Sequence, residues 1–270
     1  MAEYLERNQV PLDKQGKPIQ TLNLSESNYT DGDMEGLSAS LRKNTCFTGG
    51  IDLSNNRITD LGVLELTESL SSSLTPITAL DLSGNNLKER SGIYLGNYLG
   101  IQNNPLQELS IDRCNVSSIG LQRILENLPE NKKLRTLRLG EVSAQGVSII
   151  ASYLPSAQKL INITLSQEGE WDEETRNTLI GAFEANKSVR HAEIGSENWE
   201  LKEEIESLIH RNKHAYHEKL KKKDAAKSVD PKHYAEKIQY YIENSVQNLP
   251  VRIFLQNSLG TILNLSLIHI

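Results

Sequence analysis

The stretch Ile77-Thr78-Ala79-Leu80-Asp81-Leu82-Ser83-Gly84-Asn85-Asn86-Leu87 contains the pattern on which most of the chain is built. Aliphatic residues stand at its first, fourth and sixth positions, and an Asn follows three positions after the sixth. The sixth position recurs at Leu24, Leu53, Leu82, Ile111, Leu139, Leu165 and Ile194. The intervals between these residues are 29, 29, 29, 28, 26 and 29 residues, which is typical of a solenoid of stacked units.

Each unit is predicted to contain a short strand, a turn and a helix. Apolar and polar residues alternate over each run, as in a half-buried strand, and a Gly and a helical pattern follow. One such unit cannot bury its own apolar face, so neighbouring units must stack and share a core. The repeated Asn56 and Asn85 admit two interpretations, a ligand-binding row or inward side chains that satisfy backbone groups at the strand ends. We favour the second interpretation.

These repeats resemble the leucine-rich repeat family, in particular its long-repeat branch with ribonuclease inhibitor, the Ran GTPase-activating protein and tropomodulin. The resemblance covers roughly residues 19 to 212. It implies an α/β solenoid, shaped as a horseshoe or arc, with parallel strands on the concave face and helices on the convex face. We expect residues 1–18 to cap the first repeat, and residues 19–224 to form the repeat domain with a closing helix.

Residues 225–270 read as a linker, an amphipathic helix after Asp230-Pro231, and an apolar tail. The chain stops inside the apolar run 263–270, so we interpret this end as truncated or partly foreign sequence. Arg252 and Gln256 interrupt the tail, which argues against a membrane-spanning segment.

Composition narrows the class of partner. A net charge of −6 and few aromatic residues argue against nucleic acid. Cys46 and Cys114 cannot form a disulfide framework, and Cys114 occupies the slot of the repeated Asn, where we expect a buried structural thiol. The first residues lack an apolar core of signal-peptide length, so we expect a cytoplasmic protein.

Catalytic motifs are missing from the sequence. It contains no Gly-rich phosphate loop, nucleophile elbow or paired catalytic motif, so we predict a non-enzyme without cofactors. His210, His214 and His217 would share a helix face, but no further ligand is plainly placed to complete a metal site.

Two further segments admit two interpretations each. The acidic loop 166–174, with Trp171, reads either as a contact site or, as we favour, as a helix start capped by Asp172. The lysine-rich run 219–224 reads as a nucleic-acid or membrane contact or, more simply, as a solvated helix end.

The polar strand positions are the best candidates for a site. The slot between the last two aliphatic positions gives Asn23, Asp52, Asp81, Ser110, Arg138, Thr164 and Glu193 as a row across the concave face. With neighbouring slots, the candidate partner-binding residues are Asp52, Asp81, Glu108, Asp112, Arg113, Arg135, Arg138, Arg190 and His191. The face is acidic over repeats two to four and basic at Arg113, Arg135 and Arg138. Such a divided pattern favours a protein partner with complementary charge, although a merely solvated face is the simpler alternative.

We therefore predict a scaffold that binds an unidentified protein on the concave face, with no nucleic acid, membrane or small-molecule substrate. The resemblance implies two alternatives, regulation of a small GTPase and capping of actin filaments. Members that regulate GTPases carry a long acidic tail, whereas this C-terminal segment is basic and then apolar. The capping alternative lacks a visible N-terminal actin-binding or tropomyosin-binding region.

Overall fold

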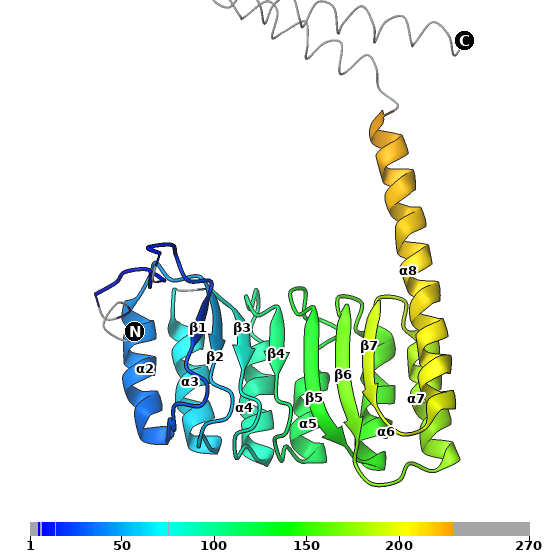
Figure 1. Ribbon diagram of the computed structural model, residues 1–270, viewed down its shortest axis with the longest axis horizontal. Coiled ribbons are helices and arrows are strands. Elements are labelled where there is room, and N and C mark those ends of the chain that lie inside the picture. Colours follow the sequence, from blue (N-terminus) through cyan, green and yellow to red (C-terminus); the bar gives the residue numbers. More distant parts are fainter. Residues whose placement is uncertain (1–4, 6, 14, 75, 229–270) are drawn as a thin grey trace, which may run out of the picture. The chain divides into compact units, whose positions relative to one another are not determined.

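Strands and helices alternate along the chain in the computed structural model, which describes residues 5, 7–13, 15–74 and 76–228 (Figure 1). The strands are β1 (Thr21–Asn23), β2 (Gly49–Asp52), β3 (Ile77–Asp81), β4 (Glu108–Ser110), β5 (Thr136–Val142), β6 (Asn162–Gln167) and β7 (His191–Gly195). The helices are α2 (Asp31–Lys43), α3 (Asp60–Ser72), α4 (Glu89–Leu99), α5 (Ser118–Leu125), α6 (Ala144–Tyr153), α7 (Glu173–Ala185) and α8 (Trp199–Ser228), with a short 3₁₀ turn at Leu154–Ser156. The chain divides into two compact units, residues 1–212 and 213–270.

The seven strands form one parallel sheet in chain order, and helices α2 to α7 lie on one side of it (Figure 1). Asp52 pairs in register with Asp81, and Asp81 pairs with Ser110. The next residues along these strands, Leu53, Leu82 and Ile111, therefore lie side by side, and all three are buried. The predicted α/β solenoid is confirmed.

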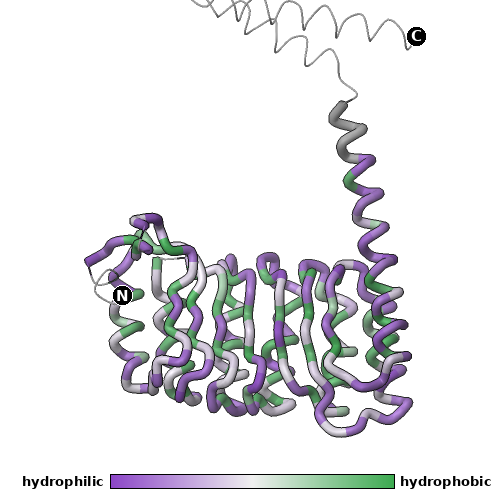
Figure 2. The backbone as a smooth tube through the Cα atoms, viewed as in Figure 1, coloured by the Kyte–Doolittle hydropathy of each residue, from purple (hydrophilic) through white to green (hydrophobic). Residues whose placement is uncertain are grey.

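Aliphatic side chains between the sheet and the helices form one continuous core in residues 1–212. Figure 2 shows hydrophobic and hydrophilic segments alternating within every repeat. The helices approach closely because glycines stand at their contacts: a Cβ on Gly92 of α4 would overlap the backbone of Gly120 in α5. Each strand–helix unit thus buries its apolar face against the next one.

The repeated Asn side chains are directed inward, as we favoured from the sequence. Asn85 Nδ2 donates to the carbonyls of Leu53 and Leu82 at 2.9 and 2.8 Å, and its Oδ1 accepts from the Ile58 N–H at 3.0 Å. Asn56 makes the same bonds one repeat earlier, to Leu24 and its own Leu53. These bonds satisfy backbone groups that would otherwise be buried without a partner.

Acidic residues in the first turn of two helices cap the following helix. Asp31 accepts from the Thr59 and Gly62 N–H groups at 2.8 and 3.0 Å, at the start of α3. Asp60 accepts from the Lys88 and Ser91 N–H groups at 3.0 Å, at the start of α4. A negative charge at a helix start is favourable, so these contacts stabilise the stacking of neighbouring units.

Repeats five and six differ from this pattern. Val142 stands where the Asn would be, is buried, and extends β5 through a register shift at Gly140, whose φ is +74°. Trp171 is 2% exposed, and its Nε1 donates to the Val142 carbonyl at 3.0 Å. Asp172 is the N-cap of α7 and accepts from the Thr175 N–H at 2.8 Å, so the interpretation of this loop as a capped helix start is confirmed.

At the first end of the repeat array, Leu5 is buried in the core, and its carbonyl accepts from Asn44 Nδ2. The cap over residues 1–18 stays a prediction. Helix α8 continues to Ser228, whereas the sequence predicted a linker from residue 225. The predicted amphipathic helix and apolar tail lie outside the described residues. No helix that the structure describes has both the length and the apolar character needed to cross a membrane.

Candidate functional site

The predicted polar row lies in register across the sheet. Its members pair from strand to strand in the order Asn23, Asp52, Asp81, Ser110, Arg138, Thr164 and Glu193. Side chains of a strand alternate between its two faces, and the flanking aliphatic residues point into the core, so this row faces away from the helices. We call the side of the sheet opposite the helices the strand-lined face.

The two Asp carboxylates of this row accept hydrogen bonds from the backbone just after their own strands. Asp52 Oδ1 accepts from the Ser54 N–H at 3.0 Å, and Asp81 Oδ1 accepts from the Ser83 N–H at 2.9 Å. Asn23 makes the same bond to Ser25 at 3.0 Å, which shows that a neutral amide fits the position equally well. Both carboxylates are half-buried, and no ion pair with either of them occurs among the described residues.

A hollow of about 190 Å³ lies beside these two carboxylates. Gly50 and Ala79 form part of its floor. They stand two residues before Asp52 and Asp81 on the same strands, pair with each other, and carry almost no side chain. Glu108 and Arg138 contribute to its lining as well. Sequence reasoning missed these small residues, although their alignment at one repeat spacing was visible.

The other predicted residues fall into three groups. Glu108 and Arg138 share the strand-lined face, with 3.9 Å between their charged groups, and His191 is exposed in the same row as Glu108. Asp112 and Arg113 follow β4, with 3.5 Å between their charged groups, and Arg113 occupies a turn with φ of +51°.

Arg135 and Arg190 are not brought into the row. Each lies one residue before the paired part of its strand, and its backbone N–H donates to the preceding unit, to Gln107 and Ile161 respectively. The Arg135 guanidinium donates to the carbonyls of Lys132, Leu134 and Lys159 at 3.0, 3.2 and 3.4 Å. This side chain therefore belongs to the edge of the sheet where the strands begin.

Cys114 replaces the repeated Asn and makes a weaker version of its contacts. Its Sγ lies 3.3 Å from the Leu82 carbonyl and 3.5 Å from the Asp112 carbonyl. Burial raises the pKa of the Cys114 thiol to about 11, which makes it a structural rather than a reactive group. Within the described ranges, no group of three or more His, Cys, Asp or Glu side chains is arranged to hold a metal ion.

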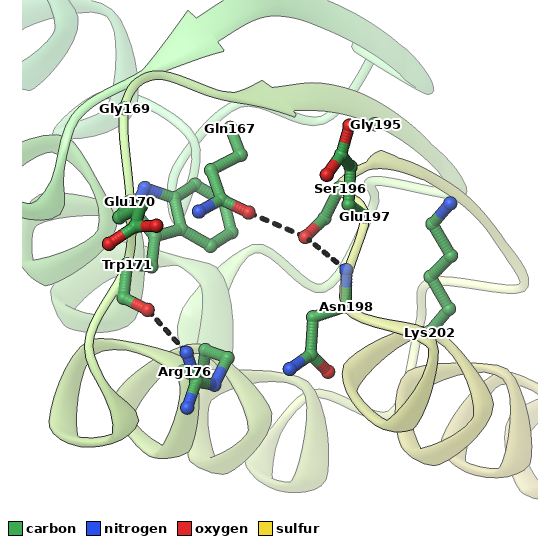
Figure 3. A pocket seen from close by; sticks show the side chains of 10 residues that line it. All are labelled: Gln167, Gly169, Glu170, Trp171, Arg176, Gly195, Ser196, Glu197, Asn198 and Lys202. Carbon is green, nitrogen blue, oxygen red and sulfur yellow. Dashed lines mark hydrogen bonds between the residues drawn. The ribbon is translucent and has the colours of Figure 1, made fainter.

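A second hollow, of about 690 Å³, lies where β6 and β7 end and α7 and α8 begin (Figure 3). Glu170 and Glu197 line it together with Arg176 and Lys202, so its charges balance. Arg176 donates to the Trp171 carbonyl, and Ser196 Oγ bonds to Gln167 Oε1 at 2.5 Å. These bonds fix the loops, and the balanced charge indicates no particular ligand.

The comparison with protein families supports the architecture. The family model described as "Leucine Rich repeat" matches residues 51–66, which span β2, the Asn56 turn and the first half of α3. Together with the seven stacked strand–helix units, this match supports a leucine-rich repeat architecture. No curated protein matches the sequence.

The solved structures that match this chain include two that align with more than 80% of its length. One is described as leiomodin-1 actin-binding site 2; it is 16% identical, with a TM-score of 0.36, and the match covers 83% of this chain and 95% of that one. The other is the tropomodulin C-terminal domain of Caenorhabditis elegans, 13% identical, with a TM-score of 0.35 and coverage of 81% and 94%. At these values neither likeness tells what this chain binds.

Proposed function

We propose that the chain is a non-enzymatic interaction scaffold that binds a partner protein on its strand-lined face. A positively charged segment of that partner would contact Asp52, Asp81 and Glu108. The observation that carries this proposal is the pair of adjacent, backbone-held carboxylates beside a hollow that small residues leave open. None of the helices that the structure describes from α2 to α7 covers this face (Figure 1).

Preorganisation favours binding by these carboxylates. A carboxylate that already accepts a backbone hydrogen bond loses little further freedom when a cation approaches its second oxygen. Like charges on adjacent rungs repel each other, and a positive group placed between them relieves that repulsion. A complementary charge mainly raises the association rate and fixes the orientation of the complex.

The size of the hollow favours a side chain over a small molecule. Its volume of about 190 Å³ equals that of roughly six water molecules at about 30 Å³ each. Pockets for drug-sized ligands are larger, on the order of 300–1,000 Å³. The end of one long basic side chain from a protein partner matches both the volume and the charge.

Site-specific photo-crosslinking tests the proposal. A photoreactive amino acid at Ala79 reports on the strand-lined face, and the same group at the exposed Gln122 of α5 reports on the helix side. In extract of the source organism, Ala79 should cross-link to a defined protein, and an oligolysine peptide should compete while an oligoglutamate peptide should not. Cross-linking from Gln122 alone would place the binding surface on the helices and refute the proposal.

The alternatives from the sequence remain predictions. A GTP turnover assay with candidate small GTPases tests the regulatory alternative, and acceleration by the purified chain would support it. A filament elongation assay with purified actin tests the capping alternative, and slower growth at one filament end would support it.

A further inference from the structure

A basic hollow of about 630 Å³ lies at the edge of the sheet where β4, β5 and β6 begin. Three loops line it, 100–104, 127–135 and the segment around Lys159. Its charged residues are Lys132, Lys133, Arg135, Lys159 and Glu130. From this arrangement we infer a binding site for a ligand that carries two or more phosphate groups.

The loops of this hollow are fixed before any ligand arrives. Asn104 is 3% exposed, and its Nδ2 donates to the Tyr98 carbonyl at 2.7 Å while its Oδ1 accepts from the Leu106 N–H at 2.9 Å. Asn131 Nδ2 donates to the Leu99 carbonyl at 3.0 Å, which ties the second loop to the end of α4, where the first loop begins. Because the walls are ordered, the lysines that they carry converge on one place at little entropic cost.

Arg135 links the second loop to the third. Its guanidinium donates only to carbonyl oxygens, those of Lys132, Leu134 and Lys159. A carbonyl satisfies a hydrogen bond without cancelling the charge, so the half-buried guanidinium contributes a full positive charge to the hollow. Three hydrogen bonds of its five possible N–H donors are made to these carbonyls, so much of its contribution to a ligand is electrostatic attraction.

The positive charge of the hollow is uncompensated. Four cations and one carboxylate, Glu130, give a formal balance of +3, in a chain whose net charge is −6. None of these five side chains takes part in an ion pair within the described part of the chain. The cations therefore repel one another, and a multiply charged anion would relieve that repulsion.

The chemistry of the lining favours phosphate groups. Lysine binds phosphate as a point charge from many directions, whereas bidentate carboxylate recognition needs an open Arg fork, and carbonyls already accept from Nη1 and Nη2 of Arg135. Gln102 and Asn103 are exposed at the rim and add neutral donors. A volume of about 630 Å³ admits more than one phosphate group.

Isothermal titration of the full chain with inorganic tripolyphosphate tests the site. Binding should be detectable at low salt and weaken as salt rises, since exposed charges are screened. The variant K132A/K133A should bind at least about tenfold more weakly, which corresponds to about 1.4 kcal/mol. The control K221A/K222A removes two adjacent lysines from α8 and should bind as the wild type does. If K132A/K133A does not fold, K159A replaces it and should show a smaller loss.

Two further binding experiments distinguish a phosphorylated lipid headgroup from a free oligophosphate as the ligand. Vesicles with a phosphatidylinositol bisphosphate that bind the chain and are displaced by tripolyphosphate would assign the site to a lipid headgroup. Binding of tripolyphosphate without vesicle binding would assign it to a free oligophosphate. The inference is overturned if tripolyphosphate does not bind, if both double variants lose binding equally, or if an oligoglutamate peptide binds as tightly.

Discussion

The first four repeats and the later ones solve the same backbone problem with different residues. In the first half, Asn56 and Asn85 turn the chain out of its strands, and Asp31 and Asp60 cap the helix of the next unit. In the second half, β5 continues to Val142, and Trp171 donates to the carbonyl at its end. Helices α6 and α7 are capped by their own Ser143 and Asp172, as Ser117 already caps α5 in the fourth repeat.

This difference shows which features the fold requires. Every strand end needs a donor for its last carbonyl, because a buried backbone group without a partner is costly. An Asn ladder is one solution and a single large side chain is another. The first solution repeats from unit to unit, whereas the second concentrates stability in one residue.

The largest predicted effect therefore falls in the second half. Trp171→Ala should lower the free energy of unfolding by about 4 kcal/mol, since it removes a fully buried indole. Trp171→Phe should cost only about 1–2 kcal/mol, because mainly the hydrogen bond to Val142 is lost. Urea denaturation followed by circular dichroism measures both, and a loss below about 1 kcal/mol for the alanine variant would contradict this role.

The Asn ladder should show the next largest effect. Asn85→Ala should cost about 2–3 kcal/mol, because it leaves the buried Ile58 N–H unpaired and removes one of the two donors from each of the Leu53 and Leu82 carbonyls. Asn56 still donates to the first carbonyl, and only the weak Cys114 thiol to the second. Cys114→Ala is the matched control at the equivalent position, and its weaker contacts predict a loss of about 1 kcal/mol. Equal losses of stability in the two variants would mean that side-chain volume, and not the hydrogen bonds of the Asn ladder, stabilises this position.

The acidic helix caps of the first half should make the stability of the protein depend on pH. Burial acts to raise the pKa of Asp60, but hydrogen bonds from Ser91 and Lys88 and the Lys88 charge outweigh it, so the pKa is lowered. The stabilisation is then complete above the unfolded pKa, near 4, and is lost as pH falls through the lower folded value. Thermal melts from pH 6 to pH 3 should therefore show a steeper decline for the wild type than for Asp60→Asn. Parallel declines would argue against this cap.

The smallest effect concerns thiol reactivity at the point where the two halves meet. With its pKa raised to about 11 by burial, Cys114 should not react with a thiol reagent at pH 8, whereas the exposed Cys46 should. One thiol per chain should titrate in the native protein, and both of the two cysteines should titrate in urea. Two fast thiols in the native state would show that the Cys114 position opens readily.

Much of this structure could be predicted from the period alone. A repeat of 29 residues fixes which residues become neighbours, so the row from Asn23 to Glu193 follows from counting. Side chains alternate between the two faces along each strand. Arg135 and Arg190 precede Thr136 and His191 by one residue, so the sequence already indicated that they do not share the face of those residues. The extension of β5 and the two larger hollows depend on loop conformations, which the repeat pattern does not specify.

The association rate of the partner that cross-links through Ala79 provides the most direct test of binding at Asp52 and Asp81. In the variant D52N/D81N the backbone hydrogen bonds remain possible, as Asn23 shows, and only the charge is lost. We predict that the association rate falls about tenfold at low salt, with a melting temperature within about 2 °C of the wild type. An unchanged association rate in a stably folded variant would contradict docking on the strand-lined face.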